Sequence, residues 1–132
     1  MKTLALAVLP DTLAICRLAP AAPIPAWVRG DFVSITRTRD ELAIVCAQTC
    51  APDGIPCERD WRALRVVGQL EFALTGILAS LAAPLADAGI SIFAVSTFDT
   101  DYVLVKARDL AKAADALQKA GHTIAGGQPL IV

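Results

Sequence analysis

Residues 61–105 read WRALRVVGQLEFALTGILASLAAPLADAGISIFAVSTFDTDYVLV, and this stretch decides the fold. Its first apolar run, residues 63–70, predicts a strand. Apolar residues then recur at helical spacing as far as Gly89, and glycine commonly follows the last residue of a helix. Residues 90–95 and 102–106 predict two further strands joined by a polar turn. The stretch therefore predicts a strand, a helix and a hairpin.

The elements after this stretch complete a known order. A second helix is predicted by apolar residues at helical spacing, namely Leu110, Ala113, Ala114 and Leu117. Gly121 ends this helix, and residues 122–125 predict a short last strand. Strand, helix, strand, strand, helix, strand is the split βαβ or ferredoxin-like arrangement. Pro84 lies inside the first helix, where we expect it to remove a backbone donor and to kink or strain the helix.

The first half of the chain repeats part of this pattern. FVSITRTRDELAIV and FAVSTFDTDYVLV each place a threonine four residues before an aspartate at a predicted hairpin: Thr36 and Asp40 in the first, Thr97 and Asp101 in the second. In the first copy, residues 20–30 take the place of the long helix, because prolines interrupt helical hydrogen bonding. We therefore predict an α+β fold of two tandem ferredoxin-like βαββαβ repeats with antiparallel sheets, the first lacking a full first helix.

The repeats predict two halves in one small chain. Residues 1–60 form the degenerate first repeat, and residues 61–132 form the complete second repeat. In the first half, residues 13–18, 32–36 and 42–47 predict strands. With 132 residues, of which 55% are hydrophobic, the chain has ample apolar material for a packed core. The surplus further predicts that a second chain covers some apolar surface, and we expect a homodimer.

Charge and hydropathy exclude several classes of partner. The formal net charge is −1 at pH 7, so the chain has no electrostatic footprint for nucleic acid or for an anionic membrane. No uncharged stretch reaches the roughly 20 residues that span a bilayer. The start of the chain superficially resembles a signal peptide, but Pro10 and Asp11 interrupt its apolar run. We expect a cytoplasmic protein.

The candidate catalytic and metal-binding residues match no common pattern. The single histidine, His122, follows the glycine that ends a helix, so we expect it to form hydrogen bonds in a turn or at the start of a strand. Cys46, Cys50 and Cys57 do not have the spacing of a zinc site. Cys16 and Cys46 lie in apolar runs, where a reduced cysteine behaves as a small core residue. We predict no catalytic residue, no metal and no cofactor.

Residues 61–105 closely resemble the second half of the small ACT-domain proteins that are built as two tandem ACT-like repeats. They are also similar to the family of the animal cytosolic arginine sensor, which contains the same repeat pair twice. The string STFDTDYVLV, which follows AGIS, is the most specific part of the resemblance. The resemblance implies ACT-like folds for both predicted repeats. It also implies a regulatory role, because ACT domains bind amino acids or other small ligands at interfaces between domains.

The start of the first predicted helix is one candidate ligand site. Where the strand passes into the helix, the backbone N–H groups of Gly76, Ile77 and Leu78 suit a carboxylate. The alternative is that Thr75 caps the helix and that water fills the rest of the site.

The polar turn of the hairpin is the second candidate. Its sharper interpretation is that the hydroxyls of Ser96 and Thr97 orient an amino acid while Asp101 takes the amino group or a cationic side chain. The alternative is turn chemistry, because Asp and Thr bond their own backbone. The resemblance implies that Thr97, Phe98 and Asp101, together with the strand-to-helix turn, match ligand-site positions of the arginine sensor. Leu74 stands where the sensor has an acidic residue, which implies a smaller or less basic ligand.

The sequence therefore predicts a non-catalytic ACT protein that binds a small molecule, an amino acid in the first instance, at an interface between domains or subunits. The alternative is a structural module that joins a protein partner through its sheet edges, without a small ligand. An uncovered apolar sheet edge favours the alternative. A shaped polar cleft beside Thr75 and Asp101 favours ligand binding.

Overall fold

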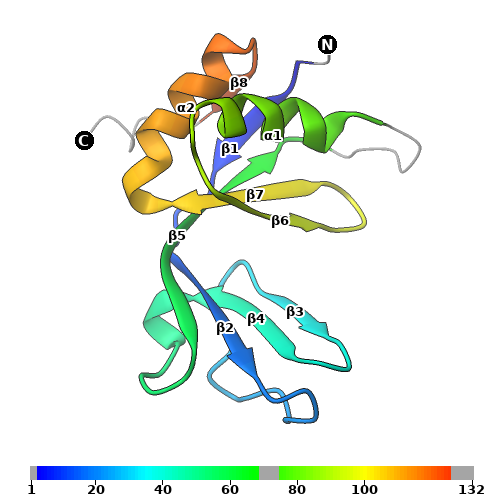
Figure 1. The fold of residues 1–132 in the computed structure, drawn as a ribbon, viewed down its shortest axis with the longest axis vertical. Helices are drawn as coiled ribbons and strands as arrows, with labels where there is room; N and C mark the ends of the chain where they lie inside the picture. Colours follow the sequence, from blue (N-terminus) through cyan, green and yellow to red (C-terminus); the bar gives the residue numbers. More distant parts are fainter. Residues whose placement is uncertain (1–2, 69–74, 126–132) are drawn as a thin grey trace. The chain divides into compact units, whose positions relative to one another are not determined.

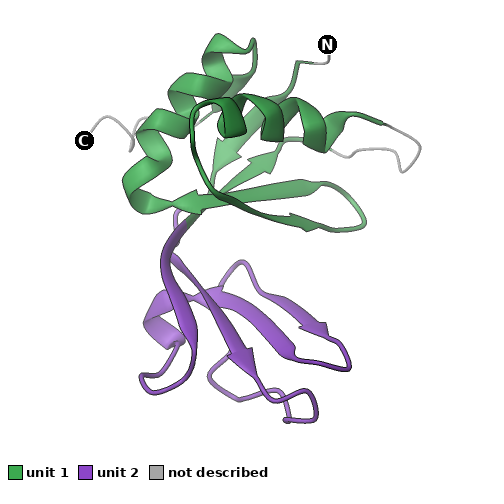
Figure 2. Cartoon of the chain, viewed as in Figure 1, with its two compact units in different colours: residues 1–9, 62–132 green, residues 10–61 purple. Residues whose placement is uncertain are grey.

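The computed structural model describes residues 3–68 and 75–125, and the chain divides into two compact units (Figures 1 and 2). Unit 1 contains Met1–Leu9 and Arg62–Val132, and unit 2 contains Pro10–Trp61. Unit 2 is therefore inserted into the chain of unit 1. The first nine residues belong to the same unit as the second predicted repeat, so the compact units do not coincide with the two sequence copies. The division into sequence copies after residue 60 stays a prediction.

Unit 2 is an antiparallel sheet with ferredoxin-like strand order. Its strands are β2 (Leu13–Leu18), β3 (Ser34–Arg37), β4 (Leu42–Ala47) and the first part of β5 (Cys57–Val66). They pair in the order β3-β4-β2-β5, which places the fourth strand of the copy beside the first. Among its described residues, unit 2 has no α-helix, only a 3-10 turn, η1 (Gln48–Cys50). The prediction that the first copy lacks a full first helix is confirmed.

The Pro-rich segment after β2 covers part of the unit 2 sheet, as a helix does in a complete copy. Its residues Ala22, Trp27 and Val28 pack against the buried side chains of the unit 2 sheet. Arg37 on β3 holds the segment in place, because its guanidinium donates hydrogen bonds to the carbonyls of Pro20 and Ala22. One side of the sheet therefore acquires an apolar cover without helical hydrogen bonding.

Unit 1 contains the predicted order of strand, helix, strand, strand, helix and strand. After the last part of β5 come α1 (Ile77–Asp87), β6 (Ile92–Ser96), β7 (Asp101–Lys106), a 3-10 turn η2 (Ala107–Asp109), α2 (Leu110–Lys119) and β8 (Thr123–Ala125). The strands pair in the order β8-β1-β5-β7-β6, and both helices lie over one face of this sheet (Figure 1). The predicted α+β, ferredoxin-like architecture is confirmed.

The N-terminal strand changes one feature of the predicted sheet. β1 (Ala5–Val8) lies between β5 and β8, antiparallel to β5 and parallel to β8. Leu6 is opposite Val66 on one side and Ile124 on the other. The prediction of purely antiparallel sheets is wrong for this pair: β1 occupies the place beside the first strand, so β8 pairs with β1 instead. The sheet of unit 1 is mixed.

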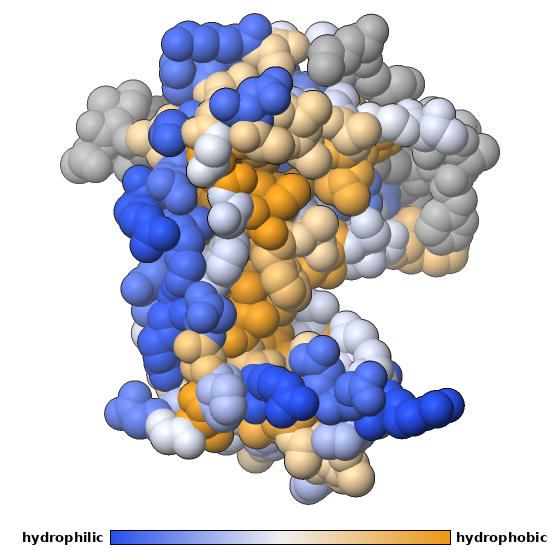
Figure 3. Space-filling model, in the orientation of Figure 1, coloured by the Kyte–Doolittle hydropathy of each residue, from blue (hydrophilic) through white to orange (hydrophobic). Residues whose placement is uncertain are grey.

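The core of unit 1 lies between the sheet and its two helices. Fully buried aliphatic side chains come from both layers, namely Leu6, Leu64, Val66, Val103, Val105, Leu81, Leu85 and Leu117. Burying each such side chain stabilises a fold by about 1.5–3 kcal/mol. Hydrophobic residues also reach the surface of both units, as the orange areas of Figure 3 show. The large exposed ones among the described residues are Ile24, Val33, Ile35, Val67, Leu78 and Phe98.

Both helices of unit 1 end at the glycines that the sequence indicates. Gly89 after α1 and Gly121 after α2 have φ values of 75° and 102°, a left-handed conformation that glycine adopts without a Cβ clash. In each case the following N–H returns to the last turn of the helix. For α2 this is the N–H of His122, which lies 3.0 Å from the carbonyl oxygen of Leu117. The glycine turn therefore fixes the backbone position of His122.

His122 is buried and joins two backbone groups from distant parts of unit 1. Its Nδ1 accepts a hydrogen bond from the N–H of Leu4 at 3.0 Å, so Nε2 carries the proton and donates to the carbonyl of Ser80 at 2.9 Å. In an unbroken helix, the carbonyl of Ser80 accepts from residue 84. Pro84 has no N–H to give, and His122 supplies the missing donor. The predicted hydrogen-bonding role of His122 is confirmed.

A bulge in β5 marks the passage from one unit to the other. The pairing of β2 with β5 shifts register between Leu13 and Ile15, and Asp60 has a positive φ of 68°. Gln48 holds Asp60 through two bonds: its Nε2 donates to Oδ1 of Asp60 at 3.0 Å, and its Oε1 accepts from the backbone N–H of Asp60 at 2.5 Å. Residues 57–61 pair in unit 2, and the rest of β5 pairs in unit 1.

The pairing of His122 with Pro84 makes a testable prediction. His122→Phe leaves the Leu4 N–H and the Ser80 carbonyl without their partner, so the free energy of unfolding should fall by about 1–3 kcal/mol for each group. In a Pro84→Ala background, the backbone of the substituted residue supplies an N–H to the Ser80 carbonyl, and the same His122→Phe substitution should cost less. Urea unfolding of the four proteins measures the coupling, which we expect to exceed ~1 kcal/mol. Additive effects of the two substitutions contradict the assigned partnership.

Candidate functional site

The turn between β6 and β7 is closed by the threonine at its start. The N–H and the hydroxyl of Thr97 donate to the carbonyl of Thr100 at 2.9 and 3.1 Å, and the hydroxyl accepts from the N–H of Thr100 at 3.3 Å. The hydroxyl of Thr97 therefore performs turn chemistry. Ser96 and Asp101 lie opposite each other at the end of the ladder, so three of the predicted ligand residues come together here.

Unit 2 contains the same turn. Between β3 and β4, the N–H and the hydroxyl of Thr38 donate to the carbonyl of Glu41, and the hydroxyl accepts from the N–H of Glu41. Thr38 therefore corresponds to Thr97. The sequence alignment that matched Thr36 with Thr97 was displaced by two residues, because threonine occurs at both positions of TRT. In the corrected alignment, Arg37 and Leu42 of unit 2 stand where unit 1 has Ser96 and Asp101.

Thr100 attaches the turn to the sheet. Its side chain is buried, and its hydroxyl donates to the carbonyl of Val66, the last residue of β5, at 2.8 Å. The next residue, Val67, donates its N–H to the carbonyl of Ala5 at 2.8 Å. The end of β5 is therefore held from both sides. The sequence showed Thr100 only as one of several polar turn residues, and nothing in its spacing signalled this contact.

The beginning of α1 has no side-chain cap. Gly76 is the N-cap residue, in a left-handed conformation with φ 77°, and its carbonyl accepts the first helical bond, from Ser80 at 2.9 Å. Thr75 is exposed and does not cap the helix, in contrast to the simpler interpretation of the sequence. Among the described residues, the N–H groups of Ile77 and Leu78 thus have neither a helical partner nor a side-chain acceptor. The side chain of Ile77 belongs to the core, whereas that of Leu78 is exposed.

The two candidate groups lie at the same end of unit 1. The chain leaves the sheet after Val66, where Thr100 anchors the hairpin, and returns at the beginning of α1; Figure 1 shows the turn and the helix start on the same side of the unit. Asp101 is half-buried and has no ion-pair partner within the described residues. Phe98, at the tip of the turn, is 75% exposed. Leu74, at which a departure from the arginine sensor was noted, lies outside the described residues.

The described part of the chain has neither a membrane-spanning helix nor a cluster of metal ligands. No helix there is long and apolar enough to cross a bilayer. The residues in 3–68 and 75–125 also contain no group of three or more His, Cys, Asp or Glu side chains arranged to hold a metal ion.

Family models and solved structures match both parts of the chain. The model described as ACT domain matches residues 57–119, and a second model, for an N-terminal domain, matches residues 11–57. The crystal structure of protein Atu0741 from Agrobacterium tumefaciens is 43% identical with a TM-score of 0.89, covering 94% of this chain and 93% of that one. The regulatory subunit of aspartate kinase from Thermus thermophilus shares the fold, with a TM-score of 0.64 at 14% identity, over 91% of this chain and 99% of that subunit.

Among curated proteins, the rat cytosolic arginine sensor for mTORC1 subunit 1 is 37% identical over 70 residues. These residues are 52% of this chain, and the match spans only 21% of the length of the sensor. The similarity is therefore to one part of a longer protein. The chain belongs to the ACT-domain proteins and is distantly related to the cytosolic arginine sensors.

Proposed function

We propose that this protein is a non-catalytic regulatory module that binds a free amino acid at the end of unit 1 where α1 begins and the β6–β7 turn is anchored. The observation that carries the proposal is the uncapped start of α1 at the same end of the sheet as the carboxylate of Asp101. A free amino acid carries a carboxylate and an ammonium group a short distance apart. The helix start can bind the carboxylate, and Asp101 can bind the ammonium group.

The helix start suits the carboxylate. The N–H groups of Gly76 to Leu78 are the free donors of the first turn, and the helix dipole adds positive potential there. Because no side chain in the described part of the chain accepts from these groups, a ligand does not have to displace a cap. The exposed side chain of Leu78 lies beside them and offers apolar contact.

The hairpin suits the ammonium group. The Asp101 carboxylate has no ion-pair partner among the described residues, and the Ser96 hydroxyl lies opposite it in the ladder. Thr97 shapes the turn through its backbone bonds, so we assign its hydroxyl to positioning rather than to direct selection of a ligand. Thr75 and Phe98 are exposed at the same end of unit 1 and complete the proposed contact set.

Comparison of the two units supports a site in unit 1. In unit 2 the position of Asp101 is taken by Leu42, which is fully buried, and the position of Ser96 by Arg37. Arg37 is already committed to the carbonyls of the Pro-rich segment. Unit 2 has the same turn but lacks both the carboxylate and the helix start, so the common turn alone does not make a site.

Regulation requires that the ligand bind one arrangement of the protein better than another. We place the protein in the cytoplasm as a homodimer, in which ligand binding at an interface between domains or subunits favours one packing. The similarity to a cytosolic arginine sensor supports amino-acid recognition in general. The replacement of an acidic residue by Leu74 favours a ligand smaller or less basic than arginine.

A protein-binding role is the second candidate. β3 is an edge strand of unit 2, paired with β4 alone among the described strands, and the apolar side chains of Val33 and Ile35 near it are exposed. Such an edge can accept a strand from another chain. Concentration-dependent association, combined with the absence of any amino-acid binding, favours this role.

The proposal predicts that at least one of the twenty amino acids binds the purified protein. Calorimetric titration should give a saturable isotherm, and the same amino acid at 100 times its dissociation constant should stabilise the fold by about 2.7 kcal/mol. Asp101→Asn removes the counter-charge of the ammonium group, so binding should weaken about 10- to 100-fold.

Asp115→Asn is the matched control, because it makes the same charge change on α2, where Asp115 forms only an exposed pair with Lys119 at 3.0 Å. The control should bind as the unmodified protein does. Absence of binding across the panel, or equal loss in both variants, rejects the proposed site.

A carboxylate built into the helix start should compete with the ligand. Leu78→Asp places a negative charge at the second position of α1, so the unliganded fold should gain about 0.3–1 kcal/mol while amino-acid binding weakens. Leu78→Asn is the control, since it removes the same apolar contact without the charge. The amide derivative of the same amino acid lacks the carboxylate. Its affinity for Leu78→Asp should therefore be no lower than its affinity for Leu78→Asn. Equal binding of the amino acid by both variants contradicts the carboxylate position.

A further inference from the structure

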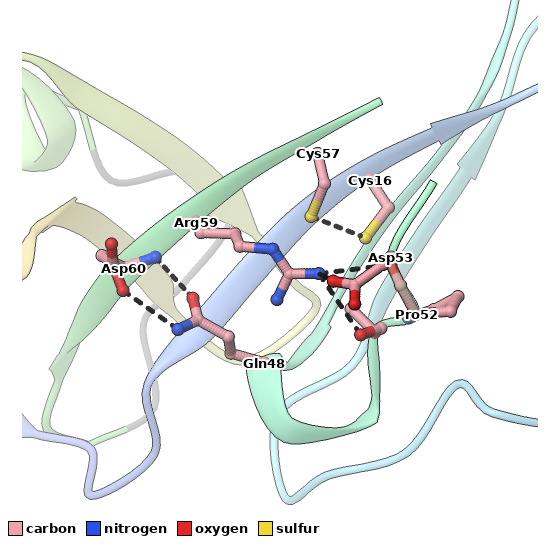
Figure 4. Close-up of polar contacts among 8 residues, drawn as sticks. Cys16, Gln48, Pro52, Asp53, Cys57, Arg59 and Asp60 are labelled. Carbon is pink, nitrogen blue, oxygen red and sulfur yellow. Dashed lines mark hydrogen bonds and ion pairs between the residues drawn. The ribbon is translucent and has the colours of Figure 1, made fainter. Parts of the chain in front are cut away.

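Unit 2 contains a pair of thiols in direct contact. Sγ of Cys16 on β2 lies 3.4 Å from Sγ of Cys57 on β5, and the two residues are opposite each other in the antiparallel ladder (Figure 4). All four cysteines of the chain are free in this structure. Neither residue has a part in the amino-acid site proposed for unit 1.

The backbone at this pair matches what a disulfide requires. The adjacent pair is hydrogen-bonded, because the N–H of Arg17 donates to the carbonyl of Pro56 at 3.0 Å. Hydrogen-bonded and non-hydrogen-bonded pairs alternate along an antiparallel ladder, so Cys16 and Cys57 form a non-hydrogen-bonded pair, with Cα atoms about 4.5 Å apart. Disulfides occur at Cα separations of about 4.4–6.8 Å. The bond can therefore form with little movement of either strand.

The two thiols have different environments. Cys16 is 1% exposed, whereas Cys57 is half-buried at the start of β5 and is the one that a small oxidant reaches first. Burial, followed by the hydrogen bond to Cys57 and the charges of Cys57 and Cys46, raises the pKa of Cys16 to about 12. Cys16 thus keeps its proton at neutral pH, and its sulfur stays within hydrogen-bonding distance of the sulfur of Cys57.

We propose that Cys16 and Cys57 form a reversible disulfide when the protein meets hydrogen peroxide. In the first step, the sulfur of Cys57 attacks one peroxide oxygen, the O–O bond breaks, and a sulfenic acid and water form. In the second step, the sulfur of Cys16 attacks the sulfenyl sulfur, the S–O bond breaks, and the proton of Cys16 leaves with the hydroxyl as a second water. Two thiols lose two electrons and two protons, and one molecule of hydrogen peroxide is reduced.

The register excludes the other nearby thiol as the favoured partner. Cys46 on β4 is opposite Ala14, so it is diagonal to Cys16 across the ladder. Diagonal neighbours lie about 7–8 Å apart, beyond the reach of a disulfide without backbone movement. Burial raises the pKa of Cys46 as well, so Cys46, like Cys16, is not the thiol that reacts first with the peroxide. Cys50 lies outside the ladder, in the 3-10 turn.

Digestion can separate the candidate partners cleanly. Cleavage after Lys and Arg and before Asp yields residues 11–17 with Cys16, residues 53–59 with Cys57, and residues 40–52 with both Cys46 and Cys50. The folded, reduced protein is treated with one equivalent of hydrogen peroxide, alkylated with iodoacetamide and digested without reductant. Mass spectrometry should find residues 11–17 joined to residues 53–59, two hydrogens lighter than their sum, and dithiothreitol should release both.

The variants test each step. Cys50→Ser, which removes a thiol outside the pair, should leave the cross-link unchanged, and Cys57→Ser should abolish it. In Cys16→Ser, the sulfenic acid of Cys57 has no resolving thiol, so dimedone should label residues 53–59. A cross-link from residues 11–17 to residues 40–52, no cross-link in the folded protein, or no dimedone label in Cys16→Ser overturns the proposal. The yield in urea, where all thiols are accessible, shows how much of the selectivity depends on the fold.

Discussion

The imidazole of His122 ties together three segments of unit 1 that are distant in sequence. It accepts a hydrogen bond from the N–H of Leu4 beside β1 and donates one to the carbonyl of Ser80 in α1, and His122 directly follows the glycine turn that ends α2. Without it, the carbonyl that Pro84 leaves without a helical donor would be buried unsatisfied, at a cost of about 1–3 kcal/mol. This one side chain therefore allows α1 to run through a proline and holds the N-terminal strand in the sheet of the C-terminal half.

The amino-acid site proposed at the end of unit 1 depends in turn on the position of α1. Its first turn is uncapped, and the bond from Thr100 to Val66 anchors the β6–β7 hairpin at the strand end from which the chain leads to that helix. The equivalent hairpin of unit 2 has the same threonine turn but uses its neighbouring positions for packing and for holding the Pro-rich segment. The duplicated turn is thus structural, and the proposed ligand contacts come from residues on which the two copies differ.

Local patterns in the sequence predicted much of this fold. The bounds of β2 and β4, the ends of both helices at Gly89 and Gly121, and the order of elements in unit 1 agree with the structure. Local patterns do not predict which residues pair across long sequence distances. The compensation of Pro84 by His122 joins residues 38 positions apart, and the parallel pairing of β1 with β8 joins the two ends of the chain. The sequence predicts a strand only from residue 63, whereas β5 begins at Cys57, where exposed charged residues alternate with partly buried ones. At the candidate site, residue types indicated the helix start and the turn chemistry of Thr97, but not the anchoring contact of Thr100.

Backbone amide resonances, followed during titration with the twenty amino acids, show whether unit 1 binds one of them between the start of α1 and the β6–β7 turn. We expect one or more amino acids to shift the amide signals of Gly76 to Leu78 together with those of Ser96 to Asp101, while the signals of the matching turn of unit 2, Thr38 to Leu42, stay unchanged. Perturbations centred on unit 2, or none at saturating concentrations of every amino acid, would contradict the proposed site.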